Sequence, residues 1–89
     1  MNEDLLDRVR TVVVAALAPD VPLTDLRPDQ DLWTAGMDSM ASVRVMLAVE
    51  ETFGIEFPEE ALTRETLASV TAIATALRDL AGPASGAAG

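Results

Sequence analysis

Apolar residues recur at the spacing of an α-helix in three separate stretches of this 89-residue chain, and this pattern limits the possible folds more than any other feature. Proline, glycine and short polar runs separate the stretches, so each is expected to form its own helix. A brief helical turn is expected at residues 58–62, because Pro58 suits the first helical position. The main helices are predicted from Glu3 to Leu17, from Asp38 or Ser39 to Gly54, and from Thr66 or Ser69 onward.

The amino-acid composition also favours helices. Hydrophobic residues make up 49% of the chain but aromatic residues only 3%, and Ala, Leu and Glu are abundant. The chain is long enough for one modest core but small for a deep substrate cavity. The sequence therefore predicts an all-α fold. We expect three main helices and one short helix in a domain at residues 1–80, with a disordered tail at residues 81–89.

The same helical spacing predicts which side of each main helix faces the core. Each helix has one stripe of apolar residues three or four positions apart. The predicted core positions are Leu5, Leu6, Val9, Val12, Val13, Ala16 and Leu17 in the first helix, Ser42, Val45, Met46, Val49 and Phe53 in the second, and Val70, Ile73, Leu77 and Leu80 in the third.

Residues 19–38 have no sustained period and are expected to form a long first loop. A loop of this length in a small domain needs anchors in the core. Val21, Leu23, Leu26, Leu32 and Trp33 are suited to that role, and "LTDL" is suited to a short turn. We interpret Trp33 as a packing anchor rather than a platform for a ligand, because buried aromatic residues are commonly part of a core.

The inventory of reactive side chains excludes most kinds of catalysis. The chain has no His, Cys, Tyr or Lys, so it lacks a thiol nucleophile, a Schiff-base amine and an imidazole base. No run of acidic residues matches a calcium-binding loop, and no metal site is expected. The chain is therefore predicted not to be an enzyme.

The net charge of −9 argues against binding to nucleic acid or to an anionic membrane. It favours a partner with a basic docking patch. The first residues, "MNEDLLDRVR", are not typical of a signal peptide, and no uncharged stretch is long enough to span a bilayer. We expect a cytoplasmic location.

The predicted second helix is apolar on two sides. Opposite its core positions lie Met40, Val43 and Leu47, together with Arg44, Glu50 and Glu51. These apolar side chains either rest against the long loop or form a docking surface for other proteins. Both interpretations stay open at this point.

Ser39 directly follows Asp38 at the start of the same helix, and its role is open on spacing alone. Either residue can be the N-cap, and a plain cap is favoured. A nucleophile is disfavoured because no His or Lys can activate the serine, and "GMDSM" lacks the two glycines of a hydrolase elbow. Ser39 is still suited to accept a group from another enzyme, because a phosphate there would lie at the positive end of the helix dipole.

A longer pattern surrounds this serine. Leu32, Gly36, Asp38, Ser39 and Met40 in "LWTAGMDSM", followed after two residues by "VRVMLAVEETFGIEFP", resemble the attachment region of the acyl and peptidyl carrier protein family, and the resemblance covers about residues 5–80. It implies a four-helix bundle with a long first loop, in which Ser39 receives the 4′-phosphopantetheine arm of coenzyme A from a phosphopantetheinyl transferase. It also implies that Asp38 is the family's aspartate beside the attachment serine. The arm's thiol then holds an acyl group as a thioester.

The resemblance also implies a partner-binding face. The fatty-acid type usually has acidic residues where Ala41 and Arg44 stand, so this chain looks closer to free-standing carriers of specialised pathways, such as nonribosomal peptide or polyketide biosynthesis. It also resembles carriers that are loaded with an amino acid by ligases related to seryl-tRNA synthetases. The expected partner-binding residues are Met40, Ala41, Val43, Arg44, Leu47, Glu50 and Glu51.

Two functions fit these sequence features. The first is a monomeric carrier that presents an acyl or aminoacyl group on Ser39, with a loading ligase or adenylating enzyme and a downstream acyl or condensation transferase as further partners. The alternative is an unmodified helical adaptor that binds a partner through Met40, Val43 and Leu47.

Overall fold

The computed structural model describes residues 3–18 and 25–88, with side chains as far as residue 80. All the regular structure in these residues is helical, which confirms the predicted all-α class. α1 has the predicted bounds, and α3 begins at Ser39 and ends one residue before Gly54. The elements are α1 (Glu3–Leu17), α2 (Leu32–Ala35), α3 (Ser39–Phe53), the 3-10 helix η1 (Glu59–Ala61) and α4 (Val70–Ala88).

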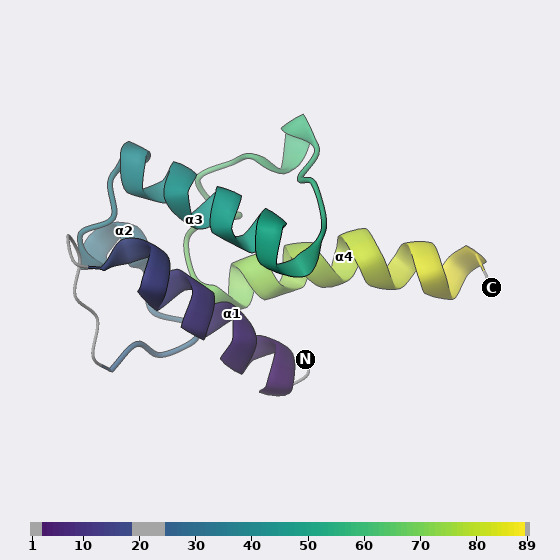
Figure 1. Cartoon of the computed structure of the whole chain (residues 1–89), viewed down its shortest axis with the longest axis horizontal. Coiled ribbons are helices and arrows are strands. Elements are labelled where there is room, and N and C mark those ends of the chain that lie inside the picture. The colour runs from purple at the N-terminus through teal and green to yellow at the C-terminus, as the bar shows by residue number, and fades with distance from the viewer. Residues whose placement is uncertain (1–2, 19–24, 89) are drawn as a thin grey trace.

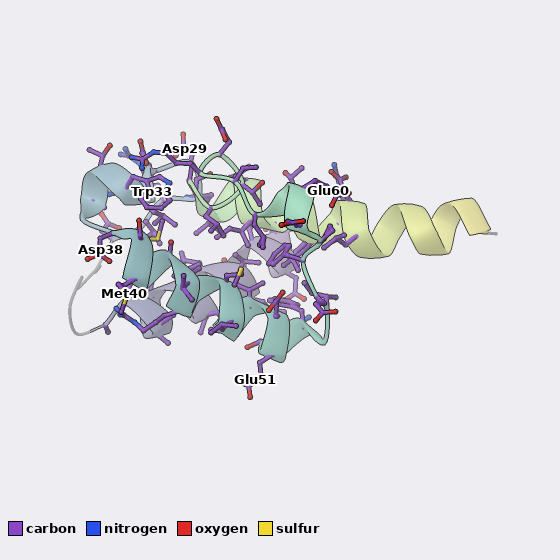
Figure 2. All side chains as sticks on the ribbon, turned by 90° about the horizontal axis from the view of Figure 1, so that it is seen from above. Asp29, Trp33, Asp38, Met40, Glu51 and Glu60 are labelled. Carbon is purple, nitrogen blue, oxygen red and sulfur yellow. The ribbon has the colours of Figure 1, made fainter. Side chains whose placement is uncertain are left out.

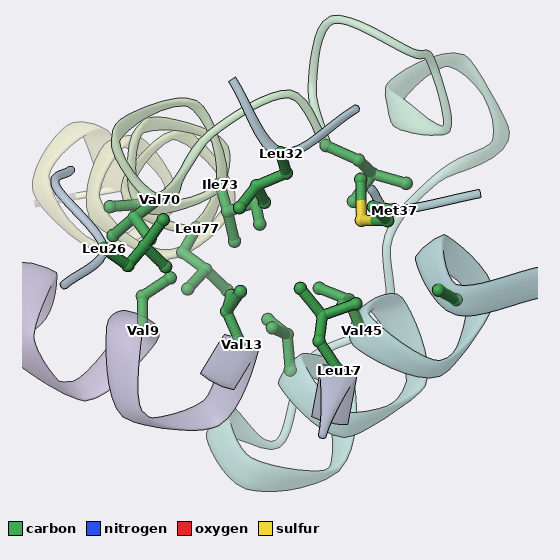
Figure 3. Close-up of a cluster of buried hydrophobic side chains, with 14 of the residues drawn as sticks. Val9, Val13, Leu17, Leu26, Leu32, Met37, Val45, Val70, Ile73 and Leu77 are labelled. Carbon is green, nitrogen blue, oxygen red and sulfur yellow. The ribbon is translucent and has the colours of Figure 1, made fainter. Parts of the chain in front are cut away.

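α1 packs against both α3 and α4, and the three long helices surround one core (Figure 1). Side chains from α1, α3 and α4 meet there with Leu26, Leu32 and Met37 from the first connection (Figure 3). The predicted stripes are confirmed. Their most buried members are Val9, Val13, Leu17, Val45, Val49, Val70, Ile73 and Leu77, and the other apolar members pack partly buried against them.

The described part of the long first connection is fastened to the start of α4. The backbone N–H of Thr71 donates to the carbonyl of Pro28 at 2.9 Å, and that of Leu32 donates to the carbonyl of Ala68 at 2.7 Å. Leu26 and Leu32 are buried anchors, as expected. Val21, Leu23 and the first half of the expected "LTDL" turn lie outside the described residues.

The sequence did not predict α2. Four residues are too short to show a helical period, so this element rests on its caps and its packing rather than on a pattern. The Asp31 carboxylate accepts hydrogen bonds from the backbone N–H groups of Trp33 and Thr34, and Gly36 ends the helix with a φ of 124°, which favours glycine. Part of the predicted long loop is therefore helical.

The second connection also differs in detail from the prediction. The turn expected at residues 58–62 is one turn of 3-10 helix, and Pro58 precedes it in an extended conformation instead of being its first residue. The Ser69 hydroxyl accepts a hydrogen bond from the N–H of Ala72 at 3.0 Å, so Ser69 rather than Thr66 caps α4.

α4 continues to Ala88 (Figure 1). Residues 81–88 are therefore helical, whereas the sequence predicts a disordered tail there. The domain boundary at residue 80 stays a prediction. No helix in the described part of the chain is long and apolar enough to cross a membrane.

Candidate functional site

The N-terminus of α3 is capped by Asp38. The Asp38 backbone is extended, with φ −105° and ψ −176°, and its Oδ1 accepts a hydrogen bond from the N–H of Ala41 at 2.8 Å. This is the geometry of an N-cap aspartate, which satisfies one of the free N–H groups of the first turn. Ser39 is therefore the first residue of the helix, and the capping role that the sequence left open belongs to Asp38.

Ser39 is exposed, and its hydroxyl makes no hydrogen bond to any other residue that the structure describes. It lies at the positive end of a 15-residue helix, where a negatively charged group is stabilised. No His or Lys exists in the sequence to remove the hydroxyl proton. The arrangement suits a serine that accepts a group from another protein, and it does not suit a serine nucleophile that acts alone.

α2 and the turn after it hold Ser39 in place from the N-terminal side. Gly36 and Met37 donate backbone hydrogen bonds to Trp33 and Leu32, and the Met37 side chain is buried. This turn joins α2 directly to the Asp38 cap. The start of α3 is thus fixed to the core two residues before Ser39.

α2 is in turn tied to the segment that leads to α4. The indole N–H of Trp33 donates to the carbonyl of Arg64 at 3.0 Å, and the Arg64 guanidinium lies 4.3 Å from the centre of the Trp33 ring. Trp33 also packs against the core, which agrees with its interpretation as an anchor. A hydrogen bond from the Thr34 hydroxyl, followed by the backbone N–H groups of Thr34 and Trp33, lowers the pKa of Asp31.

Three large apolar side chains are exposed on the outer face of α3. Met40, Val43 and Leu47 are 74%, 49% and 54% exposed, and Figure 2 shows Met40 directed away from the core at the N-terminal end of this helix. Of the two sequence interpretations, cover by the long loop is not seen among the described residues. We call these three residues the outer face. Their role in partner binding stays a prediction.

Leu62 is a fourth large apolar residue that is exposed, at 43%, and the sequence did not indicate it. It directly follows η1, in a connection with no periodic pattern, so no wheel or stripe marks it as exposed. Only the path of the chain places it at the surface.

Ala41 is a correction to the predicted partner-binding set. Its side chain is buried, so it cannot form part of an exposed face. The prediction followed from the resemblance and not from periodicity. At about 100° per residue, Ala41 lies on the side of α3 that also holds Val45.

Arg44 and Glu50 have contacts within the chain. Arg44 is exposed, and its Nε donates to the carbonyl of Ala16 at 3.3 Å in the last turn of α1. Glu50 is half-buried, and its Oε2 accepts a hydrogen bond from the N–H of Phe57 at 2.7 Å. Glu51 is exposed on α3 (Figure 2). The structure thus gives Arg44 and Glu50 a part in holding the fold, beside the partner role predicted for them.

The comparison with protein families matches residues 7–77 of the chain to the model described as "Phosphopantetheine attachment site". This match covers most of the chain and includes Asp38, Ser39 and the whole of α3.

Two curated proteins are similar to the chain in sequence. An aminoacyl carrier protein of Agrobacterium fabrum is 46% identical over 52 residues, which are 58% of this chain and 63%, just under two thirds, of that protein. An acyl carrier protein of Campylobacter hominis is 37% identical over 79 residues, covering 86% of this chain and 94% of that protein.

Solved structures give the same result for the fold. One similar chain belongs to the crystal structure of an engineered Bradyrhizobium japonicum glycine:carrier protein ligase complexed with carrier protein from Agrobacterium tumefaciens and AMP. Its TM-score is 0.74 at 34% identity, and the match covers 82% of this chain and 97% of that one. A second, from the Bradyrhizobium japonicum ligase with its cognate carrier protein and an analogue of glycyl adenylate, has a TM-score of 0.75 at 23% identity, with coverage of 86% and 99%.

Proposed function

The chain belongs to the phosphopantetheine-attachment family of carrier proteins, and from that premise we propose that Ser39 is its attachment residue and that the carried group is an amino acid. Its cofactor is the covalent 4′-phosphopantetheine arm, and its role is that of a non-catalytic carrier that presents acyl or aminoacyl groups to partner enzymes. One observation carries the proposal for Ser39. It is an exposed serine with a free hydroxyl, at the first position of α3, within the residues that the family model matches.

The surroundings of Ser39 fit the phosphate of such an arm. Asp38 already caps α3 through its side chain, so the Ser39 hydroxyl can be esterified without loss of the cap. A phosphodiester on Ser39 would carry its negative charge at the positive end of α3, which stabilises it. When attached, the arm supplies a terminal thiol on which the cargo is held as a thioester.

In the attachment step the Ser39 oxygen forms a bond to the phosphorus beside the pantetheine group of coenzyme A. The phosphoanhydride bond of coenzyme A breaks, and adenosine 3′,5′-bisphosphate leaves. The proton of the Ser39 hydroxyl goes to a base of the transferase. The contribution of this chain is therefore to hold and expose the oxygen.

The proposed cargo follows from the relatives. Two aminoacyl carrier proteins, of Agrobacterium fabrum and Bradyrhizobium diazoefficiens, are 46% and 32% identical to the chain. A chain of the engineered glycine ligase complex is 34% identical. An acyl carrier protein is also 37% identical, so the fatty-acyl alternative must be tested against the aminoacyl one.

We further propose three partners: a phosphopantetheinyl transferase, a loading ligase that activates an amino acid, and a downstream transferase that removes it. Met40, Val43 and Leu47 supply apolar contacts to them, and the net charge of −9 attracts basic surfaces. Carrier proteins bound to glycine ligases in the similar solved structures support the second partner. Monomeric state and cytoplasmic location stay predictions.

The first experiment measures the intact mass of the protein after incubation with coenzyme A and a phosphopantetheinyl transferase of broad specificity. We expect one added phosphopantetheine group on the wild-type protein and on the control variant Ser69→Ala, and none on Ser39→Ala. An equal gain on Ser39→Ala, or no gain on the wild type, would show that Ser39 is not the attachment residue.

A second experiment tests the cargo on the modified protein. We expect incubation with the Bradyrhizobium glycine:carrier protein ligase, ATP and glycine to add one glycyl group, and hydroxylamine to remove it as expected for a thioester. Loading by a fatty-acyl synthetase with a medium-chain acid, together with no loading by glycine or other amino acids through their ligases, would exclude the aminoacyl proposal.

The exposed outer face keeps one alternative open, an unmodified adaptor that binds a partner through Met40, Val43 and Leu47. That function requires Ser39→Ala to bind and act as the wild type does, whereas Leu47→Glu loses the partner. Loss of function in a folded Ser39→Ala protein would exclude the adaptor.

A further inference from the structure

Ser42 is the one buried polar side chain among the residues whose burial the structure describes, with 6% of its surface exposed. It lies one turn after Ser39 on the core side of α3. A hydroxyl in that place needs a hydrogen-bond partner, because burying it without one is costly. The partner it has is the backbone carbonyl of Ser39, at 2.7 Å from the Ser42 Oγ.

Ser42 also donates through its backbone. Its N–H lies 2.9 Å from the carbonyl oxygen of Asp38, so one residue binds the two carbonyl groups on either side of the Ser39 Cα. These carbonyls belong to the two peptide planes whose rotations are φ and ψ of Ser39. The direction of the Cα–Cβ bond of Ser39 follows from these two planes.

From this arrangement we infer that Ser42 is a positioning residue for Ser39, and that its hydroxyl holds the Cα–Cβ bond of Ser39 in the direction in which the side chain accepts the phosphopantetheine group. This inference rests on the proposed role of Ser39. The first turn of a helix lacks several intrahelical bonds and is prone to fraying. Asp38 restrains the turn at the N–H of Ala41, and Ser42 restrains it at the residue that reacts.

A purely local role for the hydroxyl makes a different prediction. Serine and threonine side chains in helices commonly bond to a carbonyl one turn back, as Thr11 does to Asp7 at 2.9 Å on α1. If the hydrogen bond of Ser42 only satisfies its own buried hydroxyl, replacing Ser42 by alanine removes both the hydroxyl and the requirement for a hydrogen-bond partner. Such a change would leave the transfer rate unaltered.

The test uses the initial rates of phosphopantetheine transfer from coenzyme A to the apo protein, with kcat and KM for the carrier determined separately. We expect Ser42→Ala to lower kcat about tenfold, since misplacement of a reacting group by a fraction of an ångström slows transfer, with KM changed by less than about twofold because the outer face is intact. Thr11→Ala removes a hydrogen bond of the same kind from α1 and should leave both constants unchanged.

Ser42→Thr is the conservative variant, because the threonine Oγ1 can bond to the same carbonyl. We expect it to recover most of kcat. Circular dichroism and urea unfolding establish that each variant is folded under the assay conditions. If Ser42→Thr does not fold, the comparison of Ser42→Ala with Thr11→Ala decides alone.

The inference is overturned if folded Ser42→Ala reacts with the wild-type kcat, or if Ser42→Thr folds and is as slow as Ser42→Ala. Either result leaves the attachment proposal intact as long as Ser39→Ala stays unmodified. Equal modification of Ser39→Ala is the separate result that overturns both.

Discussion

At the scale of single residues, Glu50 shows how one side chain can hold a connection in place. Its backbone carbonyl accepts the N–H of Ile55 at 3.1 Å, and its carboxylate accepts the N–H of Phe57 at 2.7 Å. Gly54, which lies between Glu50 and Ile55, has a φ of 67°, the left-handed conformation that ends many helices. Glu50 thereby directs the chain after α3 so that Phe57 enters the core.

This contact predicts a stability difference between two neighbouring acidic residues. Glu50→Ala leaves the partly buried N–H of Phe57 without its acceptor, and we expect it to lower the free energy of unfolding by about 1–3 kcal/mol. Glu50→Gln keeps an acceptor oxygen and should lose less. Glu51→Ala, at an exposed position on the same turn, should stay within about 0.5 kcal/mol of the wild type in urea unfolding. If the two alanine variants are equally stable, the hydrogen bond of Glu50 does not hold the connection.

Residue-level predictions from the sequence succeeded where one helix decides the outcome. The helical spacing placed Met40, Val43 and Leu47 on the side of the helix opposite the core positions, and left open whether the first loop covers them. It could not show that Glu50 reaches a later segment of the chain. Nor could it decide between Asp38 and Ser39 as the cap, because both side chains have an oxygen that can accept from the first turn.

At the scale of helices, the three long elements and the short turn at η1 could be predicted, but α2 could not. α1, α3 and α4 each repeat their apolar stripe over several turns. α2 has four residues and η1 has three, too few to show a period. Contacts with a distant segment stabilise α2, because the Leu32 N–H donates to the carbonyl of Ala68 and Arg64 stacks on Trp33. Contacts between distant segments leave no periodic mark in a sequence.

Arg44 gives a second example of support between helices. α1 has no basic residue in its last turn to offset the negative end of its dipole. Arg44 of α3 donates instead to the Ala16 carbonyl in that turn. The C-terminus of α1 is therefore stabilised by the same helix that begins with Ser39.

The end of α4 yields a prediction at this scale. Residues 81–88 include Gly82, Pro83 and Gly86, and proline within a helix lacks the N–H for one hydrogen bond and crowds the preceding turn. These residues are expected to add little stability, so a protein ending at Leu80 should unfold within about 2 °C of the full chain. Leu77→Ala, which removes a buried side chain from the same helix, should instead cost about 2–5 kcal/mol. A much lower midpoint for the shortened protein would place the domain boundary beyond residue 80.

At the scale of the whole molecule, the net charge of −9 is combined with a helix face that is apolar near Ser39. Several of the six arginines make contacts within the chain: Arg8 lies 4.7 Å from the centre of the Phe53 ring, Arg64 stacks on Trp33, and Arg44 bonds to Ala16. Between Ser39 and Val49 the sequence has no acidic residue. Long-range attraction and close contact are therefore expected to come from different parts of the surface.

This separation predicts that salt and apolar substitutions act on different rate constants of binding to a loading ligase. Raising the salt concentration from about 0.05 to 0.5 M should slow association severalfold, because it screens the attraction between an acidic carrier and a basic docking patch. Leu47→Ala should mainly speed dissociation and leave the salt dependence of association unchanged, since it removes contact area and no charge. Leu62→Ala removes an equally large exposed side chain outside α3 and is the matched control. Stopped-flow binding of the modified protein to the ligase measures both constants.

Two results would contradict this separation. If Leu62→Ala speeds dissociation as much as Leu47→Ala, the contact surface extends beyond α3. If salt leaves the association rate unchanged, the acidic charge of the molecule does not guide the ligase to Ser39.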